Sequence, residues 1–332
     1  MTIAFFQQFA QCLHQGQVVL ATVVNITGSV PRELGAKMLV NAQGEIWGTI
    51  GGGAGEAKVI RHALALMETG QPQWVEIDLS GAAHRSVEGV CGGMMQVWLQ
   101  CWQGKGAIAL IQDIIETLQG GGSCTLVTPY NSDALPYQLE HPTQADHLSA
   151  QAFVESFNPA PILLIVGAGH CGIQLAKVAD LLDFQVIVQD DRPEWANPKH
   201  YSNNIQIFTA SVQTVVSGLS AEAQLYAALV TRGYPQDVQA LLPLLSRPRP
   251  CAYIGMIGSQ QRVRRVLRAV ETEHPLSQAR LEAQPIHAPI GLDIGALTPA
   301  EIAVSIAAEL VMVRRGGTGY PLTVVSGLGE LL

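Results

Sequence analysis

A glycine-rich segment near the middle of the chain has the residue types and the spacing of a phosphate-binding turn. Gly167, Gly169 and Gly172 follow the apolar run Ile162–Val166 and precede an amphipathic stretch, in the order G-x-G-x-x-G. In this context the first glycine permits a tight turn, the second lets a pyrophosphate approach the backbone, and the third lets helix and strand pack closely. We expect the phosphate on the free N–H groups at the start of the following helix.

Two acidic residues follow this turn at the spacing at which a ribose is held. Asp190 and Asp191 end the next predicted strand, about 20 residues beyond the glycines, where an acidic side chain can bind a ribose 2′-hydroxyl. Arg192 leaves room for a 2′-phosphate, so both NAD and NADP stay open. His170 lies in the loop and either faces a ligand or packs within it. The alternative interpretation is a fold that keeps this loop for packing and binds no dinucleotide.

A second glycine-to-helix junction lies further along the chain. Gly258 and Ser259 precede a helical stretch, and Ser259 is a natural residue to cap its first turn. Arg262 lies about one turn into that helix. The sequence predicts either a second phosphate site or a solvated basic helix face here.

A third junction of this kind lies near the N-terminus. Gly51, Gly52 and Gly53 open a predicted helix, and Arg32 upstream can pair with an anion. Glu56 falls in the first turn of that helix. It belongs to the site, or it complements the helix dipole.

Cys91 is the cysteine with a setting that suggests chemistry. It lies in the turn Gly89-Val-Cys-Gly-Gly93 between apolar segments, where a thiolate can ligate molybdenum or copper or carry a transferred sulfur. The alternative is a structural thiol. The six cysteines lie far apart without zinc-type spacing, and the sequence contains no GxSxG, HExxH or Walker-type GK[ST] motif. Hydrolytic chemistry therefore has no support.

Composition excludes several classes of function. A chain of 332 residues exceeds what one hydrophobic core usually supports, and 48% hydrophobic against 14% charged residues argues against disorder. The net charge of −8 gives no general attraction to nucleic acid or to an anionic membrane. No apolar run approaches the ~18 residues that span a bilayer, and the N-terminus lacks signal-peptide features. We expect a cytoplasmic protein with no nucleic-acid or membrane partner.

The elements that must position these residues fall into two patterns. After residue 161, strands alternate with helices: strands at 162–166, 185–189, 205–208, 225–230, 252–257 and 286–287, helices at 171–182, 235–245, 260–271 and 299–314. This alternation predicts an α/β fold, a Rossmann-like doubly wound parallel sheet over residues 161–332. Residues 1–128 predict a mixed α/β domain. The polar, proline-dotted residues 129–160 predict a linker, with local hairpin structure within it left open.

Taken together along the chain, these segments resemble the xanthine dehydrogenase accessory (XdhC/CoxI) family. The resemblance is carried by GSVPRELGAKMLV, GTIGGGAGE, GVCGG, IVGAGHCG, QDDRPEWAN, YIGMIGS and APIGLDIGALTPAEIAVSIAAEL, which fall in family order and cover nearly the whole chain apart from the linker. Cys91 matches the cysteine of the family's CGG block, and Arg32 matches its PR. Gly51 to Gly53 with Glu56 match GGxxE, and Gly258-Ser259 match GS.

The resemblance implies an N-terminal XdhC/CoxI domain joined to a Rossmann domain. It also implies a chaperone that binds the molybdenum cofactor (molybdopterin) and delivers it, sulfurated, to a xanthine dehydrogenase-type molybdoenzyme. A cysteine desulfurase is the implied sulfur donor and a homodimer the implied assembly. Such a protein is an accessory factor rather than a turnover enzyme. The glycine turns at Gly51, Gly167 and Gly258 become candidate anchors for the cofactor's phosphate, with Cys91 at its metal.

Two alternatives stay open. The first is an NAD(P)-dependent oxidoreductase built on the same Rossmann unit. The sequence shows no evident Ser/Tyr-xxx-Lys relay for it, and His287 is its best remaining acid–base candidate. The second is a sulfurtransferase, which predicts a persulfide on Cys91.

Overall fold

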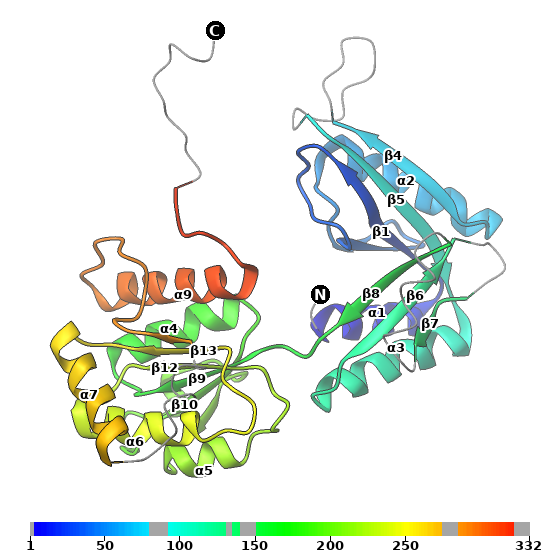
Figure 1. Cartoon of the computed structure of the whole chain (residues 1–332). Coiled ribbons are helices and arrows are strands. Elements are labelled where there is room, and N and C mark those ends of the chain that lie inside the picture. Colours follow the sequence, from blue (N-terminus) through cyan, green and yellow to red (C-terminus); the bar gives the residue numbers. More distant parts are fainter. Residues whose placement is uncertain (1–2, 80–91, 131–134, 140–150, 274–284, 322–332) are drawn as a thin grey trace, which may run out of the picture. The chain divides into compact units, whose positions relative to one another are not determined.

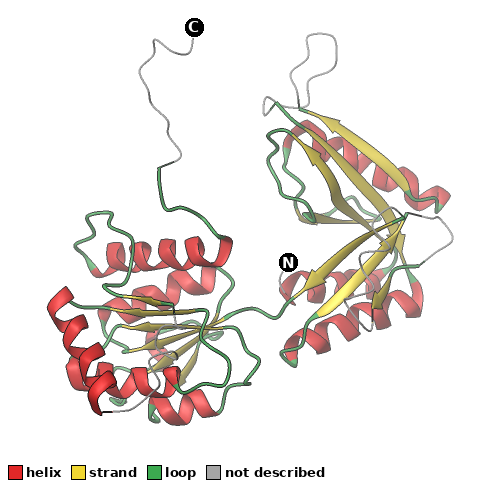
Figure 2. Cartoon of the chain, viewed as in Figure 1, coloured by secondary structure: helices red, strands yellow, loops and turns green. Residues whose placement is uncertain are grey.

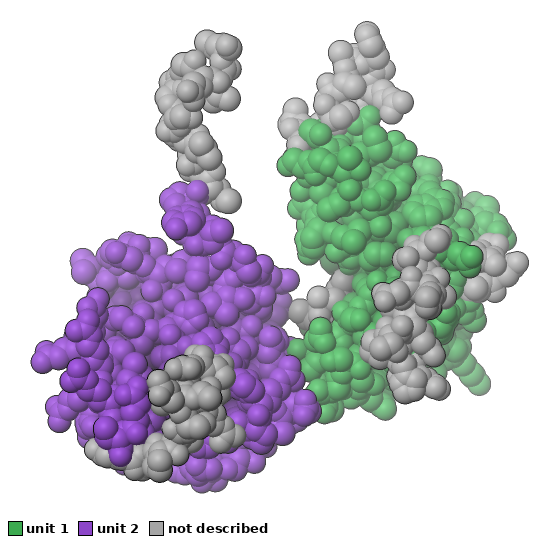
Figure 3. Space-filling model, viewed as in Figure 1, with its two compact units in different colours: residues 1–159 green, residues 160–332 purple. Residues whose placement is uncertain are grey.

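The chain divides into two compact units, residues 1–159 and residues 160–332 (Figure 3). The computed structural model describes residues 3–79, 92–130, 135–139, 151–273 and 285–321. Within that part of the chain, no helix is both long enough and apolar enough to cross a bilayer.

The first unit is built on a five-stranded antiparallel sheet, in the order β3-β2-β1-β5-β4 (Figures 1 and 2). Its strands are β1 (Val18–Thr27), β2 (Lys37–Asn41), β3 (Ile46–Gly48), β4 (Gln73–Asp78) and β5 (Met94–Trp102). Helix α2 (Gly53–Thr69) packs on one face, and α1 (Ile3–Gln15) and α3 (Gly104–Gln119) pack on the other. The central strand β1 is therefore buried on both sides, which explains why it is a continuous apolar run without alternation.

A three-stranded antiparallel sheet completes this unit. Its order is β7-β6-β8, with β6 (Cys124–Pro129), β7 (Tyr137–Leu139) and β8 (Ala152–Phe157). Strands β7 and β8 lie within residues 129–160, the stretch expected as a linker. Phe157 at the end of β8 packs edge-on against Phe6 of α1, with 4.9 Å between ring centroids.

The second unit is a six-stranded sheet, and every strand pair in it is parallel. The order is β11-β10-β9-β12-β13-β14, formed by β9 (Ile162–Val166), β10 (Gln185–Gln189), β11 (Gln206–Phe208), β12 (Leu225–Leu229), β13 (Tyr253–Met256) and β14 (Ile286–His287). The predicted α/β class, with a Rossmann-like sheet at the C-terminal end and a mixed α/β N-terminal part, is confirmed.

Helices cover both faces of this parallel sheet (Figure 1). One face packs against α4 (His170–Leu181) and α9 (Pro299–Arg315), and the other against α5 (Val212–Ser217), α6 (Tyr234–Leu245) and α7 (Gln260–Glu273). Helix α5 and the short 3-10 helix η2 (Pro198–His200) were not expected from the sequence.

The strand order reverses at β9, because the chain leaves it first toward β10 and later returns on its other side to form β12. The carboxyl ends of β9, β10 and β12 therefore meet at one edge, where doubly wound sheets bind their ligands. This brings Gly167, Asp190 and Thr231 to the same place.

Candidate functional site

The glycine turn after β9 has the conformation that its sequence predicts. Gly167 has a positive φ of 113°, and a Cβ on it would lie 2.5 Å from the carbonyl oxygen of Val230. A Cβ on Gly172 would overlap the carbonyl oxygen of Gly167. Gly167 thus has the backbone conformation of the predicted tight turn, and Gly172 has the close packing predicted for it, while a ligand contact of this turn stays a prediction. A Cβ on Gly169 would meet no atom within 4 Å, so the backbone at the start of α4 is open to an approaching group.

Asp190 braces this turn from the end of β10. Its Oδ2 accepts a hydrogen bond from the Ala168 N–H at 2.8 Å. The carboxylate also accepts the Arg192 backbone N–H at 3.1 Å and two guanidinium bonds, from Nε at 2.9 Å and Nη2 at 2.8 Å. Burial tends to raise the Asp190 pKa, but these hydrogen bonds outweigh it and hold the pKa below its usual value. The Asp190 carboxylate is therefore hydrogen-bonded to groups of the protein itself. Its contact with a ribose stays a prediction.

Asp191 is exposed and forms an ion pair with Arg232, a residue that was not among the site residues predicted from the sequence. Arg232, just after β12, donates to both of its carboxylate oxygens, at 2.6 and 2.8 Å. The Asp191 side chain is 59% exposed and that of Arg232 is 39% exposed. Hydrogen bonds from Arg232 lower the Asp191 pKa. The sequence contained a signal for Arg232, because it follows a predicted strand of the parallel sheet.

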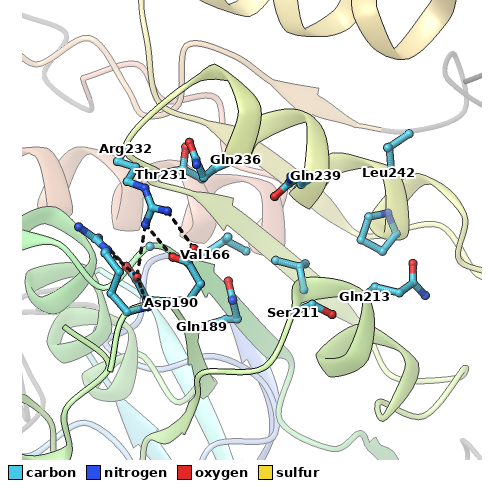
Figure 4. A pocket seen from close by; sticks show the side chains of 15 residues that line it. Val166, Gln189, Asp190, Ser211, Gln213, Thr231, Arg232, Gln236, Gln239 and Leu242 are labelled. Carbon is cyan, nitrogen blue, oxygen red and sulfur yellow. Dashed lines mark hydrogen bonds and ion pairs between the residues drawn. The ribbon is translucent and has the colours of Figure 1, made fainter. Parts of the chain in front are cut away.

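A cavity of about 390 Å³ opens beside these side chains, between α5 and α6 (Figure 4). This volume is in the range of small-molecule sites, about 300–1,000 Å³. The strand ends β9, β10 and β12 form one side of the cavity, and the two helices form the other. Its lining comprises Val166, Gly167, Gln189, Asp190, Asp191, Arg192, Ser211, Val212, Gln213, Thr231, Arg232, Gln236, Gln239, Leu242 and Pro243.

The junction before α7 is used inside the fold. The Ser259 Oγ accepts the Arg262 N–H at 3.2 Å, as expected of a helix cap. The Arg262 guanidinium turns onto the fully buried Asp237 of α6, with Nε 2.6 Å from Oδ2, and Nη2 donates to the Thr231 hydroxyl at 3.0 Å. Arg262 is therefore neither part of a solvated basic helix face nor an unpartnered ligand for a phosphate. It links α7 to α6. A Cβ on Gly258 would lie 3.0 Å from Arg262 Cδ.

The two histidines considered from the sequence have different surroundings. His170 is exposed at the start of α4, with its ring edge-on to Trp195 at 5.4 Å. His287 stacks on Tyr253 at 4.5 Å, and its Nδ1 lies 3.4 Å from Glu309. Glu309 also accepts the Tyr253 hydroxyl, so His287 belongs to a largely internal polar cluster.

In the first unit, Glu56 organises the glycine turn that precedes α2. Its Oε2 accepts the Thr49 hydroxyl at 2.6 Å, the Gly52 N–H at 3.2 Å and the Ile50 N–H at 3.3 Å. A Cβ on Gly52 or Gly53 would meet no atom within 4 Å. Glu56 therefore fixes the conformation of the loop through hydrogen bonds, while the space beside Gly52 and Gly53 is open.

This turn borders a second, smaller cavity of about 160 Å³. Its lining comprises Pro31, Ile50, Gly51, Gly52, Gly53, Gly55, Glu56, Ile77, Leu79 and Met95. Gly55 is required by close packing, because a Cβ there would lie 2.8 Å from a methyl carbon of Ile77 on β4.

The residues that flank 80–91 in the sequence are hydrogen-bonded to one another beside this cavity. The Gly92 N–H donates to the Leu79 carbonyl at 2.8 Å, and the Leu79 N–H donates to the Gly93 carbonyl at 2.8 Å. Cys91 itself lies outside the described residues. Arg32 lies on an exposed loop and pairs with Glu33 at 3.3 Å. Within the described ranges, no three His, Cys, Asp or Glu side chains gather as a metal-ion site.

Family models match both units. The model described as the XdhC Rossmann domain matches residues 163–310, and the model described as the XdhC and CoxI family matches residues 12–78. The chain belongs to the XdhC/CoxI family, as its sequence motifs predict.

Three curated relatives match over most of this chain. The uncharacterized protein YqeB of Escherichia coli is 28% identical over 324 residues, 94% of this chain but 48% of that protein, so this chain spans about half of its length. A Bacillus subtilis protein, named as a probable subunit of xanthine dehydrogenase, is 28% identical, covering 91% of this chain and 94% of that protein. The E. coli protein PaoD, named a molybdenum cofactor insertion chaperone, is 24% identical, covering 89% and 83%.

A solved structure has the same fold. The Bacillus halodurans protein described as a xanthine dehydrogenase superposes with a TM-score of 0.79 at 22% identity, over 99% of this chain and 98% of that one.

Proposed function

We propose that this protein is a cytoplasmic chaperone of the molybdenum cofactor, which binds molybdopterin, supports its sulfuration and aids its insertion into a xanthine dehydrogenase-type molybdoenzyme. The observation that carries the proposal is the similarity to the insertion chaperone PaoD, which extends over 83% of that protein. On this proposal the protein is an accessory factor rather than a turnover enzyme. A cysteine desulfurase supplies the sulfur, and the chaperone works as a homodimer.

The small cavity of the first unit supports a role in holding one end of this cargo. Its volume of about 160 Å³ is below the range of sites that enclose a whole small molecule, so it suits a terminal group. The open backbone at Gly52 and Gly53 allows close approach of an anionic group to the start of α2. Glu56, which holds the turn from within, is proposed to position the loop rather than to touch the cargo.

We assign the reactive thiol of the proposed function to Cys91. The backbone N–H of Gly92, the next residue in the sequence, donates a hydrogen bond to the Leu79 carbonyl, and Leu79 lines the small cavity. A thiolate in this part of the chain would ligate the metal or carry the sulfur that is transferred. Arg32, whose exposed ion pair with Glu33 is weak, is free to exchange its partner for a cargo phosphate.

The test is retention of molybdenum. Purified full-length protein is mixed with released molybdenum cofactor, unbound material is removed, and bound molybdenum is measured per chain. We expect near-stoichiometric retention that falls in Cys91→Ala but not in Cys101→Ala, which removes a partly buried thiol from the same unit outside the glycine turns. A persulfide, detected as the added mass of one sulfur on Cys91, would identify that residue as the sulfur carrier. Absence of retention in the unmodified protein would overturn the chaperone function.

A further inference from the structure

Helix α7 carries a concentration of positive charge in a chain whose net charge is −8. Four of the nineteen lysine and arginine residues lie within residues 262–268. Arg262 is paired inside the fold, whereas Arg264, Arg265 and Arg268 are exposed. We call these three exposed residues the α7 arginine stripe. Figure 1 shows α7 as the outermost helix of the layer that it forms with α5 and α6.

The charges of the α7 arginine stripe repel one another. Arg264 precedes Arg268 by four residues and Arg265 precedes it by three, so the side chains meet across one turn of helix, about 6 Å along the axis. Like charges at such spacings destabilise a helix. In the part of the chain that the structure describes, none of the three guanidiniums forms an ion pair with a carboxylate. Within the protein itself the stripe therefore costs stability.

The distribution of charge along α7 also opposes the helix dipole. Acidic side chains stabilise the first turn of a helix and basic side chains stabilise the last. The first turn of α7 has no acidic residue and its last turn has no basic residue, and Glu271 lies toward the C-terminal end. Helix α9 of the same unit has the favourable pattern, with Glu301 in its first turn and Arg314 and Arg315 in its last. Helix stability therefore does not explain the arginines of α7.

One guanidinium of the stripe is held in place by an aromatic ring. The Cζ atom of Arg265 lies 4.4 Å from the centroid of the Tyr234 ring on α6. This cation–π contact positions the guanidinium and leaves its N–H donors available to an acceptor outside the protein. A positioned guanidinium binds a carboxylate through two parallel hydrogen bonds. The residues that line the larger cavity do not include the stripe, which is a separate surface.

We propose that the α7 arginine stripe is a docking surface for an acidic segment of a partner protein. Its length of about 6 Å suits a short run of carboxylates, and their binding relieves the repulsion among the arginines. A long polyanion such as nucleic acid is disfavoured, because the net charge of −8 makes the rest of the surface repel it. The proposal does not rest on the chaperone function.

The experiment measures binding of fluorescein-labelled hexaglutamate to the full-length protein by fluorescence anisotropy, with labelled hexaglutamine as the uncharged probe. We expect only hexaglutamate to bind, with an affinity that falls as salt is added, because exposed charges are screened. Arg264→Glu reverses one charge of the stripe and is expected to weaken binding about tenfold. Arg61→Glu changes the net charge equally at an exposed position of α2 in the first unit. This matched control should leave the affinity nearly unchanged.

A second readout separates docking from a structural role. Arg264→Glu places a glutamate four residues before Arg268, the orientation in which such a pair stabilises a helix. The variant is therefore expected to melt at a higher temperature than the unmodified protein while it binds hexaglutamate more weakly. Loss of folding cannot produce that combination. A lower melting temperature would remove the argument from repulsion within the stripe.

Other outcomes would also count against docking of an acidic segment. Absence of hexaglutamate binding, or equal weakening by Arg61→Glu, overturns the proposal. Tighter binding of a single-stranded DNA oligonucleotide of equal charge assigns the stripe to nucleic acid instead. Displacement of the peptide by inorganic phosphate at the same total charge reduces the stripe to a simple anion site. None of these measurements involves molybdenum retention, so this proposal and the chaperone function fail independently.

Discussion

Replacing Arg262 with leucine is expected to destabilise the second unit by about 3 kcal/mol. The change leaves the carboxylate of Asp237, which has no exposed surface, with the Thr231 hydroxyl 2.5 Å away as its remaining side-chain partner among the described residues. Removing one member of a buried ion pair costs about 3–5 kcal/mol. The Arg262 side chain is itself 26% exposed, so we take the lower end of that range. For a unit of this size the loss corresponds to a melting temperature lower by about 6–12 °C.

The assay is scanning calorimetry of the full-length protein at neutral pH. Arg264→Leu, at an exposed position two residues further along α7, is the control and is expected to change stability by less than about 0.5 kcal/mol. Adding Asp237→Asn to Arg262→Leu removes the stranded charge, so part of the lost stability should return. If Arg262→Leu melts at the same temperature as Arg264→Leu, the inference that Arg262 links α7 to α6 is refuted.

Three further predictions concern other parts of the two units. Gly172→Ala places a methyl group against the carbonyl oxygen of Gly167 and is expected to lower the free energy of unfolding by about 1–3 kcal/mol or more, measured by thermal unfolding. Gly169→Ala, with open space around it, should lower it less. Equal losses of stability would contradict the packing at Gly172. Lys37 is fully buried in an ion pair with Glu155, so Lys37→Met should cost about 3–5 kcal/mol in chemical denaturation, and pairing it with Glu155→Met should recover most of this. Because the folded-state pKa of Asp190 is lowered, its carboxylate stabilises the fold above the unfolded pKa of about 3.9, and that stability is lost as the pH falls through the folded pKa. Asp190→Asn should therefore be less stable at pH 7, and its free energy of unfolding should fall less steeply as the pH is lowered. An unchanged pH dependence would argue against the hydrogen bonds from Arg192 and Ala168.

Some features of the fold could be predicted because they depend on near neighbours in the sequence. Gly172 meets the carbonyl oxygen of Gly167 within one strand–turn–helix unit, whereas the close contact of Gly167 is to Val230 at the end of β12 and is made only by the sheet. Ser259 caps α7 through the N–H three residues ahead. Helix α5 was missed because six residues are too few to display a helical period. Strand β8 was missed because its VES segment gains its strand partner only by pairing with β6, more than twenty residues earlier.

The sequence by itself determined the alternation of strands and helices, the position of the glycine turn and the family motifs, since each is written in contiguous residues. Only the tertiary structure decided which charges pair. Arg262 finds Asp237 at a separation of 25 residues, and Arg232 finds Asp191 at a separation of 41. The physical reason is that these partners are brought together by the order of strands in the sheet and by helices packed on its face. Spacing along the chain places each residue at the end of an element, but the sheet determines which ends meet.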